Sequence, residues 1–146
     1  MYKRQLHLKE KNLLDVGSGA GLPGMVLSIL DDEKNIRLLE PNQKKISFLT
    51  HVQARLDLKN TKIFKERIEN LKDICEETII TRAVMEPEKL LNSISKLNNK
   101  NLKIIMMVAE PSLTSNPNWE SKFFVSEAQK ILGKNRGFLN ITPVKN

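Results

Sequence analysis

The feature that most constrains the fold is a glycine-rich turn at residues 15–24, which begins with Asp15 and contains four glycines. A short apolar run, residues 12–14, precedes the turn, and residues 25–30 have the composition of a helix. Glycine is needed where a chain turns with positive φ, or where a Cβ would collide with a ligand close to the backbone. A strand, a glycine turn and a helix start therefore predict a nucleotide-type cofactor site.

Length and composition set the broad class. A chain of 146 residues is expected to form a single domain over residues 1–146, and a domain of that size buries roughly 70% of its unfolded surface. No apolar run approaches the roughly 18 residues needed to span a bilayer, so membrane insertion is not expected. The short basic N-terminal segment, residues 1–11, lacks the apolar core of a secretory signal. We therefore expect a cytoplasmic protein.

Few residues suggest metal or thiol chemistry. Cys75 is the single cysteine, and His7 and His51 lie far apart, so the sequence predicts neither a disulfide framework nor a metal site. Lys and Arg outnumber Asp and Glu by 24 to 17, a net charge of +7 that favours polyanionic partners through counterion release. Because the excess is spread along the chain, charge alone leaves nucleic-acid binding open.

Strand-length apolar runs alternate with helical segments, which is the pattern of βαβ units and an α/β fold with a parallel sheet. Five strands are expected, at residues 12–16, 36–39, 62–64, 78–82 and 102–108. Helices are expected at residues 25–30, 67–74, 88–97 and 44–56, the last with a mostly one-sided apolar stripe of Ile46, Leu49, Val52, Ala54 and Leu56. Residues 110–120 predict a loop, and an antiparallel hairpin is expected from residues 122–131 and 137–144.

The glycine turn allows two cofactor hypotheses. Residues 19–24 fit the dinucleotide fingerprint G-x-G-x-x-G, whereas residues 15–21 have the form D-x-G-x-G-x-G, which is typical of S-adenosylmethionine-dependent methyltransferases. A dinucleotide places its pyrophosphate at a helix N-terminus, where Asp15 would repel it, but the same carboxylate helps to orient the cationic methionine end of S-adenosylmethionine. Glu40, at the end of the second strand, can accept hydrogen bonds from the ribose hydroxyls of either cofactor. Asp15 therefore favours the methyl donor over the dinucleotide. For Glu40, the alternative interpretation is a solvated charge at the end of a strand, with no role in cofactor binding.

Further motifs follow the glycine turn in consistent order. They are Gly-Ser-Gly-Ala-Gly-Leu-Pro-Gly at residues 17–24, Leu38-Leu39-Glu40, Lys44-Lys45, Phe48-Leu49, Leu56-x-Leu58-x-Asn60, Arg67-x-Glu69 and Thr81-Arg82-Ala83-Val84. Together these motifs, within residues 13–84, resemble the RsmG (GidB) family of bacterial small-subunit rRNA guanine-N7 methyltransferases. The resemblance implies a Rossmann-like class I methyltransferase fold, with a seven-stranded, mostly parallel sheet and a C-terminal antiparallel hairpin. It also implies S-adenosyl-L-methionine as cofactor, ribosomal RNA or the small ribosomal subunit as partner, and a monomeric chain.

The resemblance assigns the site residue by residue. Those expected to hold the cofactor are Gly17, Gly19 and Leu22 around its methionine and ribose, Glu40 at the ribose, and Ile68 and Glu69 by the adenine. Arg82 matches an arginine beside the transferred methyl and is the expected catalytic residue, with a surface salt bridge as the alternative. Guanine N7 is an unprotonated lone pair, so its methylation needs an in-line approach at roughly 3 Å but no general base. Arg82 can donate to guanine O6 or to a neighbouring phosphate, and the sequence does not choose between these.

Two departures from the family pattern keep other hypotheses open. The pattern has a helical segment of several dozen residues before the first strand, whereas here Met1 to Lys11 stand in its place, so that this segment is largely missing. The pattern also tends to place a Lys-Gly pair after the fifth strand, where this chain has Glu110. The alternatives are a cofactor-binding but non-catalytic relative and, from residues 19–24, an NAD-binding oxidoreductase domain.

Overall fold

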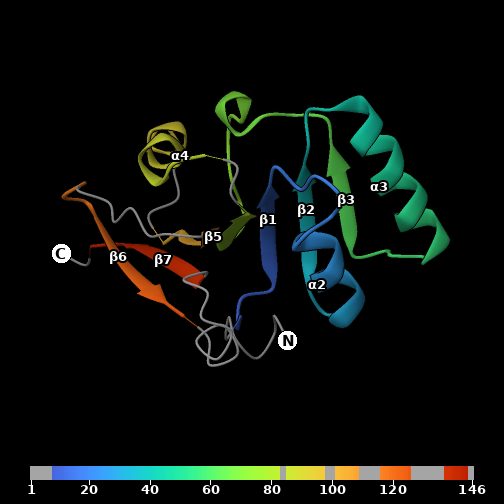
Figure 1. Ribbon diagram of the computed structural model, residues 1–146, viewed down its shortest axis with the longest axis horizontal. Helices are drawn as coiled ribbons and strands as arrows, with labels where there is room; N and C mark the ends of the chain where they lie inside the picture. The colour runs from blue at the N-terminus through green and yellow to red at the C-terminus, as the bar shows by residue number, and fades with distance from the viewer. Residues whose placement is uncertain (1–7, 83–84, 98–100, 109–115, 126–136, 145–146) are drawn as a thin grey trace.

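The computed structural model describes residues 8–82, 85–97, 101–108, 116–125 and 137–144 of the chain. Its strands are β1 (Asn12–Val16), β2 (Asn35–Leu39), β3 (Thr61–Phe64), β4 (Thr78–Arg82), β5 (Lys103–Val108), β6 (Trp119–Phe124) and β7 (Gly137–Pro143). They form one seven-stranded sheet in the order β3-β2-β1-β4-β5-β7-β6 (Figure 1). The first five strands are parallel, and β7 runs antiparallel to both β5 and β6. The sheet therefore confirms the predicted seven-stranded, mostly parallel architecture.

Apolar residues cover both faces of the central strands, because successive side chains of a strand point to opposite faces. Leu13 packs in one buried cluster, with residues of α2 (Gly24–Leu30) and α3 (Gln43–Arg55). Leu14 packs in the other, with residues of α4 (Pro87–Ile94). The two helices α2 and α3 thus cover one face of the sheet, and α4 covers part of the opposite face.

The predicted helix at residues 67–74 is wrong. Only a single 3-10 turn forms there, η1 (Ile68–Asn70), and Leu71 returns to an extended conformation with ψ 137°. The Glu66 carboxylate accepts hydrogen bonds from the Arg67 backbone N–H at 2.9 Å and from the Asn70 side chain at 2.7 Å, which closes this short turn. The extended backbone after it carries the chain to Ile74, which is buried in the core.

Helix α3 buries less apolar surface than its pattern predicts. Of the expected stripe only Leu49 is buried, whereas Ala54 and Leu56 are exposed. Gln53 is half-buried, and its Nε2 donates to the carbonyl oxygens of Leu58 at 3.3 Å and Thr61 at 2.6 Å. The helix therefore lies against the sheet through a narrow strip and leaves most of its surface in water.

The other differences are at element ends. The helix predicted at 88–97 is α4, which ends at Ile94, with Pro87 as its first residue. The loop predicted at 110–120 ends before Trp119, where β6 begins, so the first hairpin strand lies earlier than expected. Ala83, Val84, Glu110 and residues 126–136 lie outside the described residues. Within the described ranges, the helices are all too short or too polar to cross a membrane.

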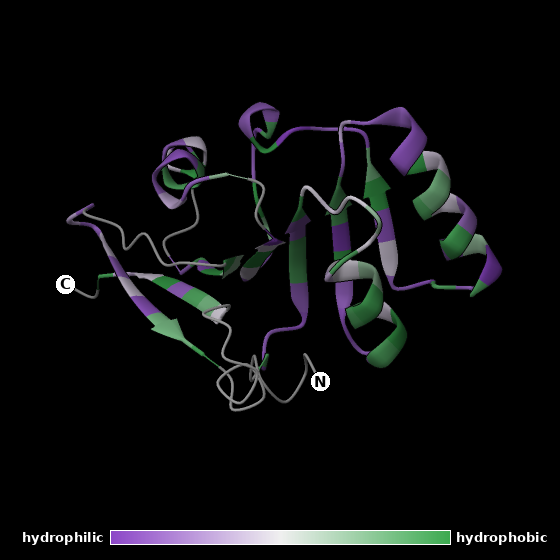
Figure 2. Ribbon diagram, viewed as in Figure 1, coloured by the Kyte–Doolittle hydropathy of each residue, from purple (hydrophilic) through white to green (hydrophobic). Residues whose placement is uncertain are grey.

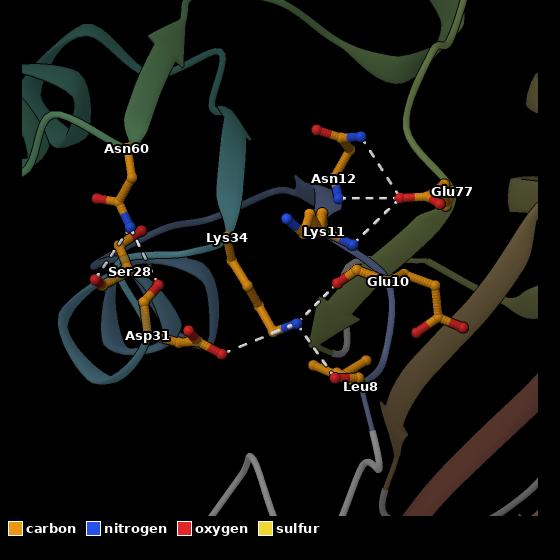
Figure 3. A network of polar contacts seen from close by, with 9 residues as sticks. All are labelled: Leu8, Glu10, Lys11, Asn12, Ser28, Asp31, Lys34, Asn60 and Glu77. Atoms are coloured by element: carbon orange, nitrogen blue, oxygen red, sulfur yellow. Dashed lines mark hydrogen bonds and ion pairs between the residues drawn. The ribbon is translucent and has the colours of Figure 1, made fainter.

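The segment before β1 is fixed at the amino ends of the strands (Figure 3). The buried Lys34 Nζ donates to the carbonyl oxygens of Leu8 at 3.1 Å and Glu10 at 2.7 Å, and lies 3.9 Å from the Asp31 carboxylate. The Glu77 carboxylate, just before β4, accepts hydrogen bonds from the backbone N–H groups at residues 11 and 12. The chain therefore enters β1 at the edge of the sheet opposite to the glycine turn.

Candidate functional site

The glycine turn lies where the strand order reverses, at the carboxyl end of β1. From β1 the chain continues to β2 on one side, while β4 pairs with β1 on the other. In open α/β sheets, crevices for ligands form at the carboxyl ends of the strands at such a switch point. Gly17, Gly19 and Gly21 have φ values of 69°, 58° and 89°, which non-glycine residues adopt only with strain. The structure thus places the predicted turn at the position typical of cofactor sites.

Backbone hydrogen bonds fold the turn over the end of β2. The N–H groups of Gly17 and Ser18 both donate to the Leu39 carbonyl oxygen, at 2.9 and 3.1 Å. The Ser18 carbonyl oxygen in turn accepts from Gly21 N–H at 2.7 Å and from Leu22 N–H at 3.2 Å. The turn is therefore fixed to the neighbouring strand before any ligand binds.

Glu40 connects the turn to the start of α3. Its side chain is buried, with 3% of the residue exposed. Oε2 accepts a hydrogen bond from Gly19 N–H at 2.8 Å, and Oε1 accepts one from Asn42 N–H at 2.9 Å. The Lys45 ammonium lies 4.0 Å from Oε2. Because each carboxylate oxygen has two lone pairs, Glu40 can hold the turn and still accept a hydrogen bond from a ligand hydroxyl.

Asp15 lies beneath the turn and is fully buried. Its Oδ2 accepts a hydrogen bond from Gly24 N–H at 2.9 Å. This bond joins the carboxyl end of β1 to the first residue of α2. Its Oδ1 is buried with no hydrogen-bond partner among the residues that the structure describes. Burial raises the pKa of Asp15 from 3.8 to about 7, although the Gly24 N–H and the charge of Arg82 both oppose this shift. Asp15 is thus part of the scaffold of the turn.

The burial of Asp15 predicts a pH dependence of stability. Because its folded pKa of about 7 exceeds its ordinary value of 3.8, the folded protein binds more protons between these values than the unfolded chain. Unfolding free energy attributable to Asp15 should therefore fall by about 1.4 kcal/mol per unit as pH rises from about 4 to about 7, and level off above. Asp15→Asn keeps a carbonyl oxygen for Gly24 N–H but does not titrate. Urea unfolding at a series of pH values should show the fall in wild type and lose it in Asp15→Asn, whereas equal slopes would contradict the buried carboxyl.

The glycines of the turn have different neighbours. A Cβ at Gly24 would lie 2.5 Å from both Asp15 Oδ2 and Leu38 Cδ2, and a Cβ at Gly21 would lie 2.6 Å from Met25 Cβ. At Gly19 the nearest atom to a Cβ would be the Gly17 carbonyl oxygen, at 3.8 Å. Gly21 and Gly24 are therefore required by packing within the protein, whereas the space at Gly19 is open.

Arg82 lies beside this turn, as the last residue of β4. The preceding residue, Thr81, pairs with Val16 of β1, and its Oγ1 donates to the Val16 carbonyl oxygen at 2.9 Å. Arg82 is exposed, and its charge reaches Asp15 electrostatically. The structure therefore brings the predicted residues Asp15, Gly17, Gly19, Glu40 and Arg82 together at one edge of the sheet.

The remaining predicted residues are less clearly grouped. Leu22 is half-buried within the turn, and Glu69 is exposed in η1. Ile68 packs in the buried cluster that includes residues of α4, with 1% of its surface exposed.

Asn42 was not predicted, although its side chain caps α3 by accepting hydrogen bonds from the backbone N–H groups of Lys44 and Lys45. An Asn just before a helix is a recognised N-cap signal, so the sequence did contain this information.

Comparison with known proteins bears on the same region. The family described as GidB, rRNA small subunit methyltransferase G, matches residues 3–136. The chain belongs to the GidB family. The ribosomal RNA small subunit methyltransferase G of Ruthia magnifica subsp. Calyptogena magnifica is 41% identical over 102 residues, 69% of this chain and 50% of that protein. The protein of the same name from Campylobacter jejuni subsp. doylei is 38% identical over 99 residues, 67% of this chain and 52% of that protein.

Similarity to solved structures shows that this chain has the Rossmann-like class I methyltransferase fold. A mutant of MtNAS crystallised in complex with S-adenosylmethionine superposes with a TM-score of 0.76 at 11% identity, covering 99% of this chain and 59% of that one. A putative methyltransferase from Escherichia coli gives a TM-score of 0.71 at 14% identity, covering 99% and 84%. The chain spans about half the length of the curated GidB relatives it matches.

Proposed function

We propose that this chain binds S-adenosyl-L-methionine at the glycine turn and transfers its methyl group to guanine N7 in small-subunit ribosomal RNA. Family membership supports the reaction and the substrate class. The observation that carries the proposal is the pairing of Glu40 with Gly19, since a buried carboxylate holds an open glycine position at the switch point of the sheet. The chain is expected to act as a cytoplasmic monomer.

The residues at the turn fit this cofactor chemically. Around Gly19 there is room for a ligand close to the backbone, and Glu40 has acceptor capacity for ribose hydroxyls. Asp15 and Glu40 place two carboxyl groups near one turn, which suits a ligand with an ammonium and a sulfonium better than one with a pyrophosphate. When bound, S-adenosylmethionine supplies an electrophilic methyl group on a positively charged sulfur.

The direct role proposed for Asp15 is narrower than its position in the motif suggests. Its side chain has no exposed surface, and one oxygen already binds Gly24 N–H. We infer that Asp15 acts on the cationic end of the cofactor indirectly, by holding the turn through its hydrogen bond with Gly24 N–H. Glu40 then takes the ribose, and the half-buried Leu22 contacts the cofactor from the opposite end of the turn. Ile68 and Glu69 remain the proposed neighbours of the adenine. The Ile68 side chain is buried in the core.

Arg82 is the proposed catalytic residue, because it is exposed beside the turn and can orient guanine through O6 or anchor a nearby phosphate. Arg82→Ala should leave S-adenosylmethionine affinity within about two-fold and lower methyl transfer by about 100-fold, the effect of removing one well-placed electrostatic group. Transfer of a labelled methyl group to small subunits or naked ribosomal RNA, with mass spectrometry for N7-methylguanine, measures both rate and product. Lys89→Ala, an exposed cation on α4, is the control.

The same assay separates the alternatives. N7-methylguanine formed by wild type and lost in Arg82→Ala supports the proposal. Cofactor binding without any methyl transfer would contradict catalysis and favour the non-catalytic relative. If Arg82→Ala transferred methyl groups as fast as the control Lys89→Ala, the catalytic role of Arg82 would be contradicted. The rest of the proposal would stand.

A further inference from the structure

The outer surface of α3 carries cations and an aromatic ring in one row. Lys44, Phe48, His51 and Arg55 follow one another at spacings of four, three and four residues, which places them on one face of a helix. All four are exposed, and Phe48 has half of its surface in solvent. We call these four residues the α3 face. Figure 2 shows the alternation of polar and apolar residues along this helix, at one end of the molecule.

Helix stability explains only part of this composition, because the helix dipole favours a positive charge at Arg55 in the last turn but not at the other end of the helix. The 13 residues of α3 include no Asp or Glu, so the cations lack acidic partners on their own helix. Lys44 lies in the first turn, where the helix dipole disfavours a positive charge. The neighbouring Lys45 is directed to Glu40, and Asp57, just after the helix, is paired with Lys59 at 3.3 Å. Neither Lys44 nor the exposed ring of Phe48 therefore stabilises the helix at its position.

The α3 face begins close to the candidate cofactor site. Asn42, which caps α3, donates its backbone N–H to Glu40, the residue that holds Gly19. In Figure 1 the helix runs beside the edge strand β3, and its first turn lies at the same edge of the sheet as the glycine turn. From Lys44 to Arg55 the face is about 16 Å long at 1.5 Å per residue, roughly the length of five stacked nucleotides.

We propose that the α3 face binds a single-stranded segment of the RNA substrate and leads it towards the glycine turn. Lys44 and Arg55 neutralise phosphates at the two ends, Phe48 stacks on a base, and His51 hydrogen-bonds between them. Basic residues combined with an exposed aromatic ring are the usual elements of single-strand binding, and base stacking on aromatic side chains is common in RNA recognition. This inference rests on the proposed function, because it takes RNA as the substrate class.

Fluorescence anisotropy with a labelled, mixed-sequence single-stranded RNA tests the surface at several salt concentrations. Lys44→Ala/Arg55→Ala should weaken binding and reduce the slope of log K against log salt by about 1.4, for two lost phosphate contacts. Phe48→Ala should weaken binding by a factor between about 5 and about 150 without changing that slope. The matched control is Lys72→Ala/Lys89→Ala, which removes two exposed cations elsewhere in the chain.

Equal losses in both double variants would overturn the inference, because binding would then depend on net charge and not on the α3 face. Unchanged RNA binding in Phe48→Ala and in Lys44→Ala/Arg55→Ala would also overturn it and favour a protein partner for this face. Thermal shifts with S-adenosylmethionine, recorded on the same samples, keep the two proposals distinct. Wild type that binds RNA through α3 but is not stabilised by the cofactor would contradict the proposed function while supporting the α3 face.

Discussion

Gly24→Ala is expected to lower the unfolding free energy by about 3 kcal/mol, the upper range for a group forced into a packed site. The new Cβ would lie 2.5 Å from Asp15 Oδ2 and Leu38 Cδ2 and 2.8 Å from Asp15 Cβ. These atoms belong to two buried strands, so the first turn of α2 must move and weaken the bond from Gly24 N–H to Asp15. Thermal unfolding should record a Tm about 6 to 12 °C lower than that of wild type.

Gly19→Ala is the matched control for this substitution. It adds the same methyl group where the nearest protein atom is 3.8 Å away, so the only loss is about 1 kcal/mol for a positive φ. The expected fall in Tm is about 2 to 4 °C. Similar Tm values for the two variants would contradict the separation of the glycines into packed and open positions.

Glu40→Ala is expected to reduce the affinity for S-adenosylmethionine by at least about 100-fold, or about 2.7 kcal/mol. The substitution removes the acceptor for Gly19 N–H and for Asn42 N–H at once. It therefore both frees the turn and removes the proposed partner of the ribose. Isothermal titration calorimetry measures the affinity directly, and circular dichroism shows whether the variant remains folded.

Two controls make the result for Glu40 interpretable. Glu40→Gln keeps one carbonyl oxygen as acceptor and should bind the cofactor more tightly than Glu40→Ala. Glu33→Ala removes an exposed acid from the loop before β2 and should bind like wild type. Wild-type affinity in folded Glu40→Ala would show that this carboxylate does not hold the cofactor.

The sheet was the most predictable part of the fold, because its strands are short apolar runs that alternate with polar helices. Leu13 and Leu14 are buried on opposite faces, and a strand covered on both faces produces a continuous apolar run in the sequence. The predicted bounds of β1 and β4 agree with the structure. The fold class follows from that alternation.

The segment after β3 shows where local periodicity fails. Ile68, Leu71 and Ile74 recur at helical spacing and all point at least partly into the protein. The backbone nevertheless becomes extended at Leu71. One 3-10 turn followed by extended chain also points these three side chains into the protein. Short apolar patterns do not distinguish these two solutions.

The location of the candidate site could be predicted from the sequence, but the roles of its residues could not. The glycine motif and Glu40 identify the turn, yet the requirement at Gly24 comes from Asp15 and Leu38, which meet it only through space. Likewise, the sequence places Asp15 in the motif but gives no sign that it is fully buried. For Arg82, the structure supplies the position, and the choice between guanine O6 and a phosphate depends on the RNA.

The central claim is that the glycine turn is a methyl-donor site, and a comparative thermal titration tests it most directly. S-adenosylmethionine at a hundred times its dissociation constant should stabilise wild type by about 2.7 kcal/mol, or roughly 5 to 11 °C in Tm. NAD at the same concentration should give no shift, and Glu40→Ala should lose the shift with S-adenosylmethionine. Stabilisation by NAD and not by S-adenosylmethionine would contradict this account.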